Sequence, residues 1–213
     1  MLIRELILNN CIKFGNYNLK NGEVSKYYFD IKNIISNPKL LVKIGDELYK
    51  NLNDFDIICG IPYGALPIAT YISTTYNKPL IYLRDKKKEY GTEKLIEGTY
   101  NKNDRCVIID DVITTGISLE NEINILKDEV NIVDVAVILN RQQNPICSMD
   151  FKSLFYKNDI IRYMLQDITI KKKSKLIFSA DLTDYNKIID ILNKIGIYIV
   201  ACKIHYDIIK NVE

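Results

Sequence analysis

Apolar residues in the first quarter of the chain follow three successive spacings. Residues 2–7 place Leu and Ile on one face of a helix. The stretch 14–32 then alternates apolar and polar positions around Asn21-Gly22, which predicts a β-hairpin turning at that pair. Over 37–52 the helical spacing returns, with an Asn-Pro start that suits a capped helix.

Short apolar runs alternate with helical segments from residue 56 onward. The runs are 56–60, 79–83, 106–110 and 132–139, and the intervening helical segments include 64–76 and 118–129. Strands with such continuous apolar runs are buried on both faces, which is typical of a parallel sheet with helical crossovers. The predicted fold is α/β, with a mainly parallel central sheet flanked by helices and a small N-terminal hood.

The end of the chain carries a further predicted β-α-β unit. We expect one domain over 1–170, a basic linker over 171–175 and the extra unit over 176–213. Asp184 is placed to cap the helix of that unit, and Gly196 to end it.

The composition is that of a globular protein and argues against several classes of function. The 213 residues are 47% hydrophobic and 26% charged, with a net charge of +2. This balance argues against broad electrostatic binding of nucleic acid. No apolar run approaches a membrane span, and the five dispersed cysteines fit a reducing compartment. A cytoplasmic protein with neither a membrane nor a nucleic-acid partner is expected.

Two adjacent carboxylates, Asp110 and Asp111, stand where the apolar run CVIID ends. In an open parallel sheet, ligands bind beyond the carboxyl ends of the strands. Neighbouring carboxylates repel each other, and that cost is tolerable when hydroxyls or a cation occupy the space between them. A sugar diol with Mg²⁺ nearby would fit this pair.

A Thr-Thr-Gly loop follows the acids and leads into a predicted helix. Thr114, Thr115 and Gly116 would bring hydroxyls and backbone N–H groups to the positive end of that helix, which suits a phosphate. The alternative is an ordinary turn with a capped helix.

The stretch VIIDDVITTG, residues 107–116, resembles the 5-phosphoribosyl 1-diphosphate (PRPP) signature of type I phosphoribosyltransferases. The resemblance implies that Asp110 and Asp111 hold the ribose hydroxyls and act in catalysis. It also implies that the loop after them binds the 5-phosphate. Mg²⁺ would be held through the diphosphate of the substrate, close to the two acids.

Four further stretches resemble orotate phosphoribosyltransferase and follow its order along the chain. They are NLKNGEVSKYYFD (18–30), CGIPYGALPIAT (59–70), EYGTEKLIEG (89–98) and NRQQ (140–143). The resemblance implies that Lys20, Tyr28, Phe29 and Arg141 contact orotate. Arginine can pair bidentately with the carboxylate that orotate has and purines lack.

The charged stretch 84–98 is long for a turn and is predicted to be a mobile loop over the site. Within it, Arg84 and Lys88 are expected to bind the diphosphate, with Lys88 acting in catalysis. The flanking Lys86 and Lys87 are placed to assist them. In the family this loop reaches into the partner's site, which implies a homodimer. The alternative is a solvated charge run.

Three positions depart from the bacterial pattern of the family. Gly64 stands where many members carry lysine, Asp85 where they carry a second basic residue, and Tyr90 where histidine is common. Gly64 and Tyr90 resemble the fused eukaryotic enzyme. Asp85 departs from the pattern within the predicted set of diphosphate contacts. His205, the one histidine, lies far from the motif in sequence, so no histidine acid or base is expected.

The final stretch resembles the opening of orotidine 5′-monophosphate decarboxylase, the partner domain in bifunctional UMP synthase. Asp181 and Lys203 match positions where that family contacts the nucleotide. The D-x-K-x-x-D catalytic motif of the decarboxylase is missing, and a full barrel needs about 250 residues, so no decarboxylase activity is expected. The chain is either a fragment of a longer protein or a naturally shortened one.

The resemblance as a whole implies an orotate phosphoribosyltransferase that uses orotate, PRPP and Mg²⁺ in pyrimidine biosynthesis. A phosphoribosyltransferase for another base is one alternative. A non-catalytic PRPP-binding regulator on the same fold is another.

Overall fold

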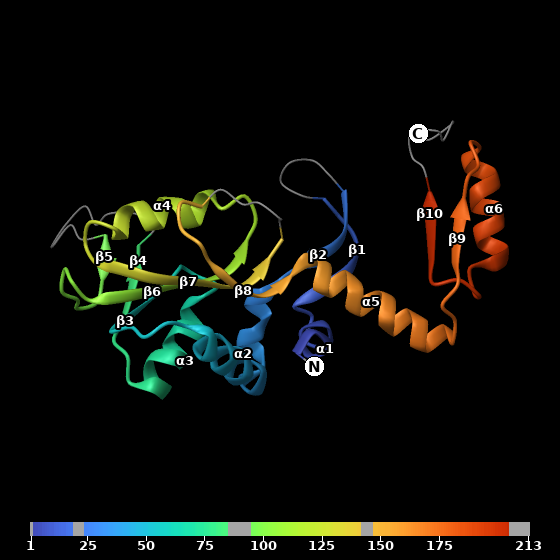
Figure 1. Cartoon of the computed structure of the whole chain (residues 1–213). Coiled ribbons are helices and arrows are strands. Elements are labelled where there is room, and N and C mark those ends of the chain that lie inside the picture. Colours follow the sequence, from blue (N-terminus) through green and yellow to red (C-terminus); the bar gives the residue numbers. More distant parts are fainter. Residues whose placement is uncertain (1, 19–23, 85–94, 142–146, 205–213) are drawn as a thin grey trace. The chain divides into compact units, whose positions relative to one another are not determined.

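A computed structural model of the chain describes residues 2–18, 24–84, 95–141 and 147–204. By its internal contacts the chain divides into two compact units, Met1–Lys157 and Asn158–Glu213. Figure 1 labels the elements of both units.

The first unit begins with the predicted helix and hairpin. Helix α1 spans Leu2–Leu8, and strands β1 (Ile12–Asn18) and β2 (Val24–Phe29) pair antiparallel, as the alternating pattern predicts. The predicted Asn-Gly turn lies outside the described residues. A short 3₁₀ helix, η1 (Ile31–Ser36), follows β2 directly.

The central sheet has six strands in the order β5-β4-β3-β6-β7-β8. Their bounds are β3 Ile57–Gly60, β4 Leu80–Leu83, β5 Ile96–Glu97, β6 Arg105–Ile113, β7 Asn131–Asn140 and β8 Lys152–Tyr156. Only β5 runs antiparallel to its neighbour, so the carboxyl ends of the other five strands share one edge of the sheet. The predicted α/β class is confirmed.

Helices cover both faces of this sheet. Helices α2 (Pro38–Asn51) and α3 (Leu66–Tyr76) lie on one face and α4 (Ile117–Leu126) on the other (Figure 1). The Asn37 side chain accepts a hydrogen bond from the Leu40 N–H at 3.1 Å, and Pro38 opens α2 as predicted.

The core lies between the sheet and its helices. All four residues of β3 are buried, as are residues 106–110 of β6 and 134–140 of β7. Burial on both faces explains why these strands read as unbroken apolar runs instead of alternating ones. It also rigidly fixes the strand ends from which the candidate site is built.

The second unit contains α5 (Lys157–Lys172, of which Lys157 belongs to the first unit), β9 (Ile177–Ala180), α6 (Tyr185–Ile195) and β10 (Ala201–Ile204). Strands β9 and β10 pair in parallel, so the predicted β-α-β unit is present. The Asp184 carboxylate caps α6 by accepting from the Asn186 N–H at 2.9 Å.

The boundary between the units differs from the predicted one. The compact units separate after Lys157, whereas the prediction placed the first domain's end at residue 170. Helix α5 runs to Lys172, so the predicted linker begins inside it. Lys171 pairs with Asp167 one turn earlier at 2.6 Å, and Lys172 donates to the Gly196 carbonyl oxygen at 2.5 Å. These contacts hold in a helix two lysines that look like linker residues in sequence.

Candidate functional site

The two predicted acids lie inside β6, at the point where the neighbouring strand β3 stops. Gly60, the last residue of β3, pairs with Ile109, and β6 continues to Ile113 beside β7 alone. The strand order reverses between β3 and β6, which is where open α/β sheets bind their ligands. Asp110 and Asp111 are therefore the first residues to emerge past β3 at this switch point.

Asp110 is the more deeply buried of the two acids, with 7% of its surface exposed. Burial, and then the neighbouring charge of Asp111, raise the pKa of the Asp110 carboxyl to about 7. Its Oδ1 atom accepts a hydrogen bond from the Asp111 N–H at 2.7 Å. The site therefore contains a carboxyl group that can gain or lose a proton near neutral pH.

Lys32 is a feature of this site that the sequence reading missed. It lies on η1, which contacts β6, and its positive charge lowers the pKa of Asp110 against the effect of burial. The sequence does show a lysine shortly after the aromatic strand β2. Nothing in its spacing, however, connects residue 32 with residue 110.

Asp111 lies against the loop that follows β3. Its Oδ1 atom accepts from the Val112 N–H at 3.0 Å. A Cβ atom built on Gly64 would stand 2.0 Å from its Oδ2 atom, so the Asp111 side chain occupies the space that a side chain at 64 would fill. This contact gives a physical reason for glycine at the position where many bacterial members carry lysine.

The loop after the acids ends at a glycine that opens α4. Thr114 and Thr115 are exposed, and Gly116 takes a left-handed backbone conformation (φ 86°) immediately before α4. That conformation favours glycine and turns the chain so that the first N–H groups of α4 point out of its N-terminus. The hydroxyls and N–H groups thus stand at one helix end, three to six residues after Asp111.

Arg84 follows β4 at the same edge of the sheet. Its Nη1 atom donates to Oε1 of Glu97 on β5 at 2.9 Å, and its backbone N–H donates to the Leu95 carbonyl oxygen. Its Nε atom is buried without a hydrogen-bond partner in the described structure. One side of the guanidinium is therefore held by Glu97, while Nε remains without a partner.

The predicted base-binding residues are brought together in part. The guanidinium of Arg141, the first residue after β7, lies 5.3 Å from the centre of the Phe29 ring. Tyr28 projects from the opposite face of β2, with its ring 5.4 Å from that of Tyr17. Tyr27, which the sequence reading did not select, lies on the Phe29 side, the two ring centres being 5.2 Å apart.

Several predicted site residues lie outside the described part of the chain. They are Lys20, the loop residues Asp85, Lys86, Lys87, Lys88 and Tyr90, and His205. Their roles stay predictions.

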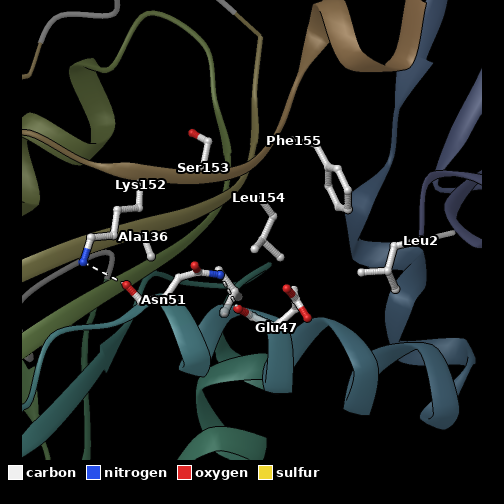
Figure 2. A pocket seen from close by; sticks show the side chains of 9 residues that line it. Leu2, Glu47, Asn51, Ala136, Lys152, Ser153, Leu154 and Phe155 are labelled. Atoms are coloured by element: carbon white, nitrogen blue, oxygen red, sulfur yellow. Dashed lines mark hydrogen bonds between the residues drawn. The ribbon is translucent and has the colours of Figure 1, made fainter. Parts of the chain in front are cut away.

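A pocket of about 470 Å³ lies elsewhere in the first unit, between β8 and the end of α2 (Figure 2). Leu2, Leu48, Leu154 and Phe155 supply much of its apolar wall. Lys152 at its rim donates to the Asn51 carbonyl oxygen at 2.8 Å. None of the residues predicted for the candidate site is among those that line it.

Two further findings on the described residues concern metal ions and membranes. Among them, no group of three or more His, Cys, Asp or Glu side chains could hold a metal ion by itself. No helix in the same part of the chain is long and apolar enough to cross a membrane.

Comparisons with known proteins agree with this geometry. The family model described as "Phosphoribosyl transferase domain" matches residues 30–161. Orotate phosphoribosyltransferase of Pyrococcus horikoshii is 42% identical over 147 residues, which are 67% of this chain and 79% of that protein. Uridine 5′-monophosphate synthase of Bos taurus is 40% identical over 136 residues, 62% of this chain but only 28% of the bovine one.

Solved structures share this fold. UMP synthase of Leishmania donovani superimposes with a TM-score of 0.68 at 32% identity, over 78% of this chain and 38% of that one. Orotate phosphoribosyltransferase of Aeropyrum pernix gives a TM-score of 0.67 at 24% identity, over 77% and 98%. The carboxylate pair at the switch point, the glycine-turned loop after it and these matches together place this chain in the phosphoribosyltransferase family.

Proposed function

We propose that this chain is an orotate phosphoribosyltransferase. It would transfer the 5-phosphoribosyl group from PRPP to orotate, giving orotidine 5′-monophosphate and pyrophosphate in pyrimidine biosynthesis. The observation that carries the proposal is the position of Asp110 and Asp111 at the switch point of the sheet, directly before the loop that ends in Gly116. Relatives about 40% identical are named for this activity or for UMP synthase.

The acids and the loop would bind the ribose 5-phosphate half of PRPP. Asp110 and Asp111 would accept hydrogen bonds from the ribose hydroxyls, which requires Asp110 to be ionised or to share its proton. The Thr114 and Thr115 hydroxyls and the first N–H groups of α4 would bind the phosphate. The contribution of a helix end to binding one exposed charge is only about 0.3–1 kcal/mol, so several hydrogen bonds are needed.

Mg²⁺ fits this site as an ion shared with the substrate. The two neighbouring carboxylates are hard oxygen ligands, but the described residues offer no third acidic or imidazole ligand to complete a protein-only site. The diphosphate of PRPP would supply the remaining oxygens. When bound, the ion would neutralise charge on the departing pyrophosphate.

The base would bind where the end of β2 lies beside the residue that follows β7. Arg141 would pair with an anionic edge of orotate, and Phe29, whose ring centre lies 5.3 Å from that guanidinium, would flank the base. Lys20 and Tyr28 stay in the proposal on the resemblance alone.

Arg84 would bind the diphosphate through the part of its guanidinium that Glu97 leaves available. Lys88 would act beside it, with Lys86 and Lys87 as weaker candidates, and the loop would serve the neighbouring site in a homodimer. These roles rest on the resemblance. A cytoplasmic location is also part of the proposal, and five free thiols support it.

The chain spans only 28% of the bovine UMP synthase. A second activity of such a longer protein is therefore not assigned to residues 176–213, where no decarboxylase motif is present.

A panel of bases tests the proposal. The protein is incubated with PRPP, Mg²⁺ and one base at a time, and the products are identified by mass. Conversion of orotate alone is expected. Conversion of another base instead would favour the same-fold alternative, and PRPP binding without any turnover would favour a regulator.

A further inference from the structure

Strand register places two cationic residues side by side at the carboxyl edge of the sheet. Asn140 and Tyr156, the last residues of β7 and β8, are paired in the parallel ladder. Arg141 and Lys157 therefore leave the same edge on neighbouring strands, which lie about 4.8 Å apart. Nothing in the spacing indicates this pairing, because fifteen residues separate the two cations along the chain.

Both cations lie over aromatic rings on the same face of β2. Tyr27 and Phe29 are two residues apart on β2 and project from one face, with ring centres 5.2 Å apart. The Arg141 guanidinium is 5.3 Å from the Phe29 ring centre, and Lys157 Nζ is 5.4 Å from the Tyr27 ring centre. Each distance is within the range of a cation–π contact.

The aromatic contacts do not neutralise these charges. Across the ranges that the structure describes, neither the Arg141 nor the Lys157 side chain has an ion pair with a carboxylate. Two unpaired cations held side by side repel each other, and an anion bound between them removes that cost. The arrangement is thus the inverse of the acidic pair on β6, and it favours a negatively charged ligand.

The ligand best suited to this face is planar and anionic. The half-buried Tyr27 supplies a flat ring at this face, whereas Phe29 is only 8% exposed. An arginine and a lysine side by side can bind one carboxylate together. A pyrimidine that bears a carboxylate has both properties, whereas uracil has only the flat ring.

We infer that Lys157 is a second cationic contact for the substrate's carboxylate and, with Arg141, selects an anionic pyrimidine over a neutral one. This inference rests on the proposed function. It adds a specificity-determining residue at the position after β8, together with Tyr27 as part of the surface that covers the base.

Steady-state kinetics of Lys157→Met and Lys157→Arg, in the full chain, test the inference. Removing the charge is expected to raise KM for orotate about tenfold, equivalent to about 1.4 kcal/mol, while kcat and KM for PRPP stay unchanged. Arginine retains the charge and is expected to stay within about threefold of the parent chain. Lys102→Met removes one exposed lysine before β6, at the opposite edge of the sheet, and is the matched control.

Two results would overturn the inference. One is an unchanged KM for orotate in Lys157→Met. The other is an equal rise in KM for orotate and PRPP with a lower melting temperature, which is the effect expected of a merely structural lysine. The parent chain is assayed first: if it does not convert orotate, the proposed function fails, whereas an active parent chain with an unaffected Lys157→Met variant contradicts the Lys157 inference alone.

Discussion

A Cβ atom on Gly64 would lie 2.0 Å from Oδ2 of Asp111, so these two residues fit together only because position 64 has no side chain. The Asp111 side chain on β6 thus packs directly against the loop after β3. Since the clashing atoms belong to the end of a side chain, Asp111 can turn away from an added methyl group. The substitution would then change the orientation of the carboxylate more than the stability of the fold.

Gly64→Ala is therefore expected to impair PRPP use while leaving the protein folded. A carboxylate displaced by about 1 Å can cost up to about a hundredfold in rate. We expect kcat/KM for PRPP to fall at least tenfold, with little change in melting temperature. In an Asp111→Ala background the same substitution should add almost nothing, because the group it displaces is gone. Additive losses would contradict the contact.

Asp110 should make stability depend on pH. Its carboxyl has a pKa of about 7 in the folded chain against 3.8 as the ordinary value, so between these values the folded state holds a proton that the unfolded state has lost. The free energy of unfolding should fall as pH rises from about 4 to about 7, by up to a few kcal/mol, and then level off.

Asp110→Asn tests this effect, because asparagine does not titrate. Urea unfolding without Mg²⁺ or substrate should give the variant a stability that exceeds the parent's by an amount growing from pH 4 to pH 7. Parallel stability curves for the two proteins would contradict the raised pKa.

The guanidinium of Arg84 should matter by its shape as well as its charge. Arg84→Lys retains the positive charge but cannot donate to Glu97 and to a diphosphate oxygen in the same fixed geometry. We expect KM for PRPP to rise about tenfold with KM for orotate unchanged. Arg105→Lys is the matched control, since Arg105 also pairs with carboxylates but stands at the start of β6. An equal effect of both variants would count against a diphosphate contact at Arg84.

The next prediction concerns stability and an ion pair made by the first residue of β8. Asp134 is 5% exposed and accepts from Lys152 Nζ at 2.5 Å and from the Asn53 N–H at 2.9 Å. Lys152→Met leaves this buried carboxylate without its cation and should reduce the free energy of unfolding by about 1–3 kcal/mol, with activity per folded molecule unchanged.

Lys50→Met is the control for this prediction in chemical denaturation. Lys50 pairs with Glu47 on the exposed side of α2, at 3.3 Å, and such pairs contribute at most about 1 kcal/mol. If the two variants lost equal stability, Asp134 would not depend on Lys152 as described.

Much of the architecture could be predicted because its signals are local. The unbroken apolar runs of β3, β6 and β7 identify a buried parallel sheet, and the Asn37-Pro38 and Asp184 caps mark helix starts. The acids and the loop ending in Gly116 lie within seven consecutive positions, so the motif could be recognised before the fold was known.

The remaining features depend on residues that only folding brings together. Strand β5 has two residues, and its existence depends on the pairing of Glu97 with Tyr82 on β4. The positions of Lys32 near Asp110 and of Lys157 beside Arg141 follow from sheet order and register, which no run of neighbouring residues encodes.

Product stoichiometry tests whether orotate is the acceptor at this site. The parent chain and Asp111→Asn are incubated with PRPP, Mg²⁺ and orotate, and the loss of orotate absorbance is followed together with pyrophosphate release. We expect one pyrophosphate and one orotidine 5′-monophosphate for each orotate consumed by the parent chain, and a large loss of rate in the folded variant. Pyrophosphate release that does not depend on orotate, or an unchanged rate in Asp111→Asn, would contradict it.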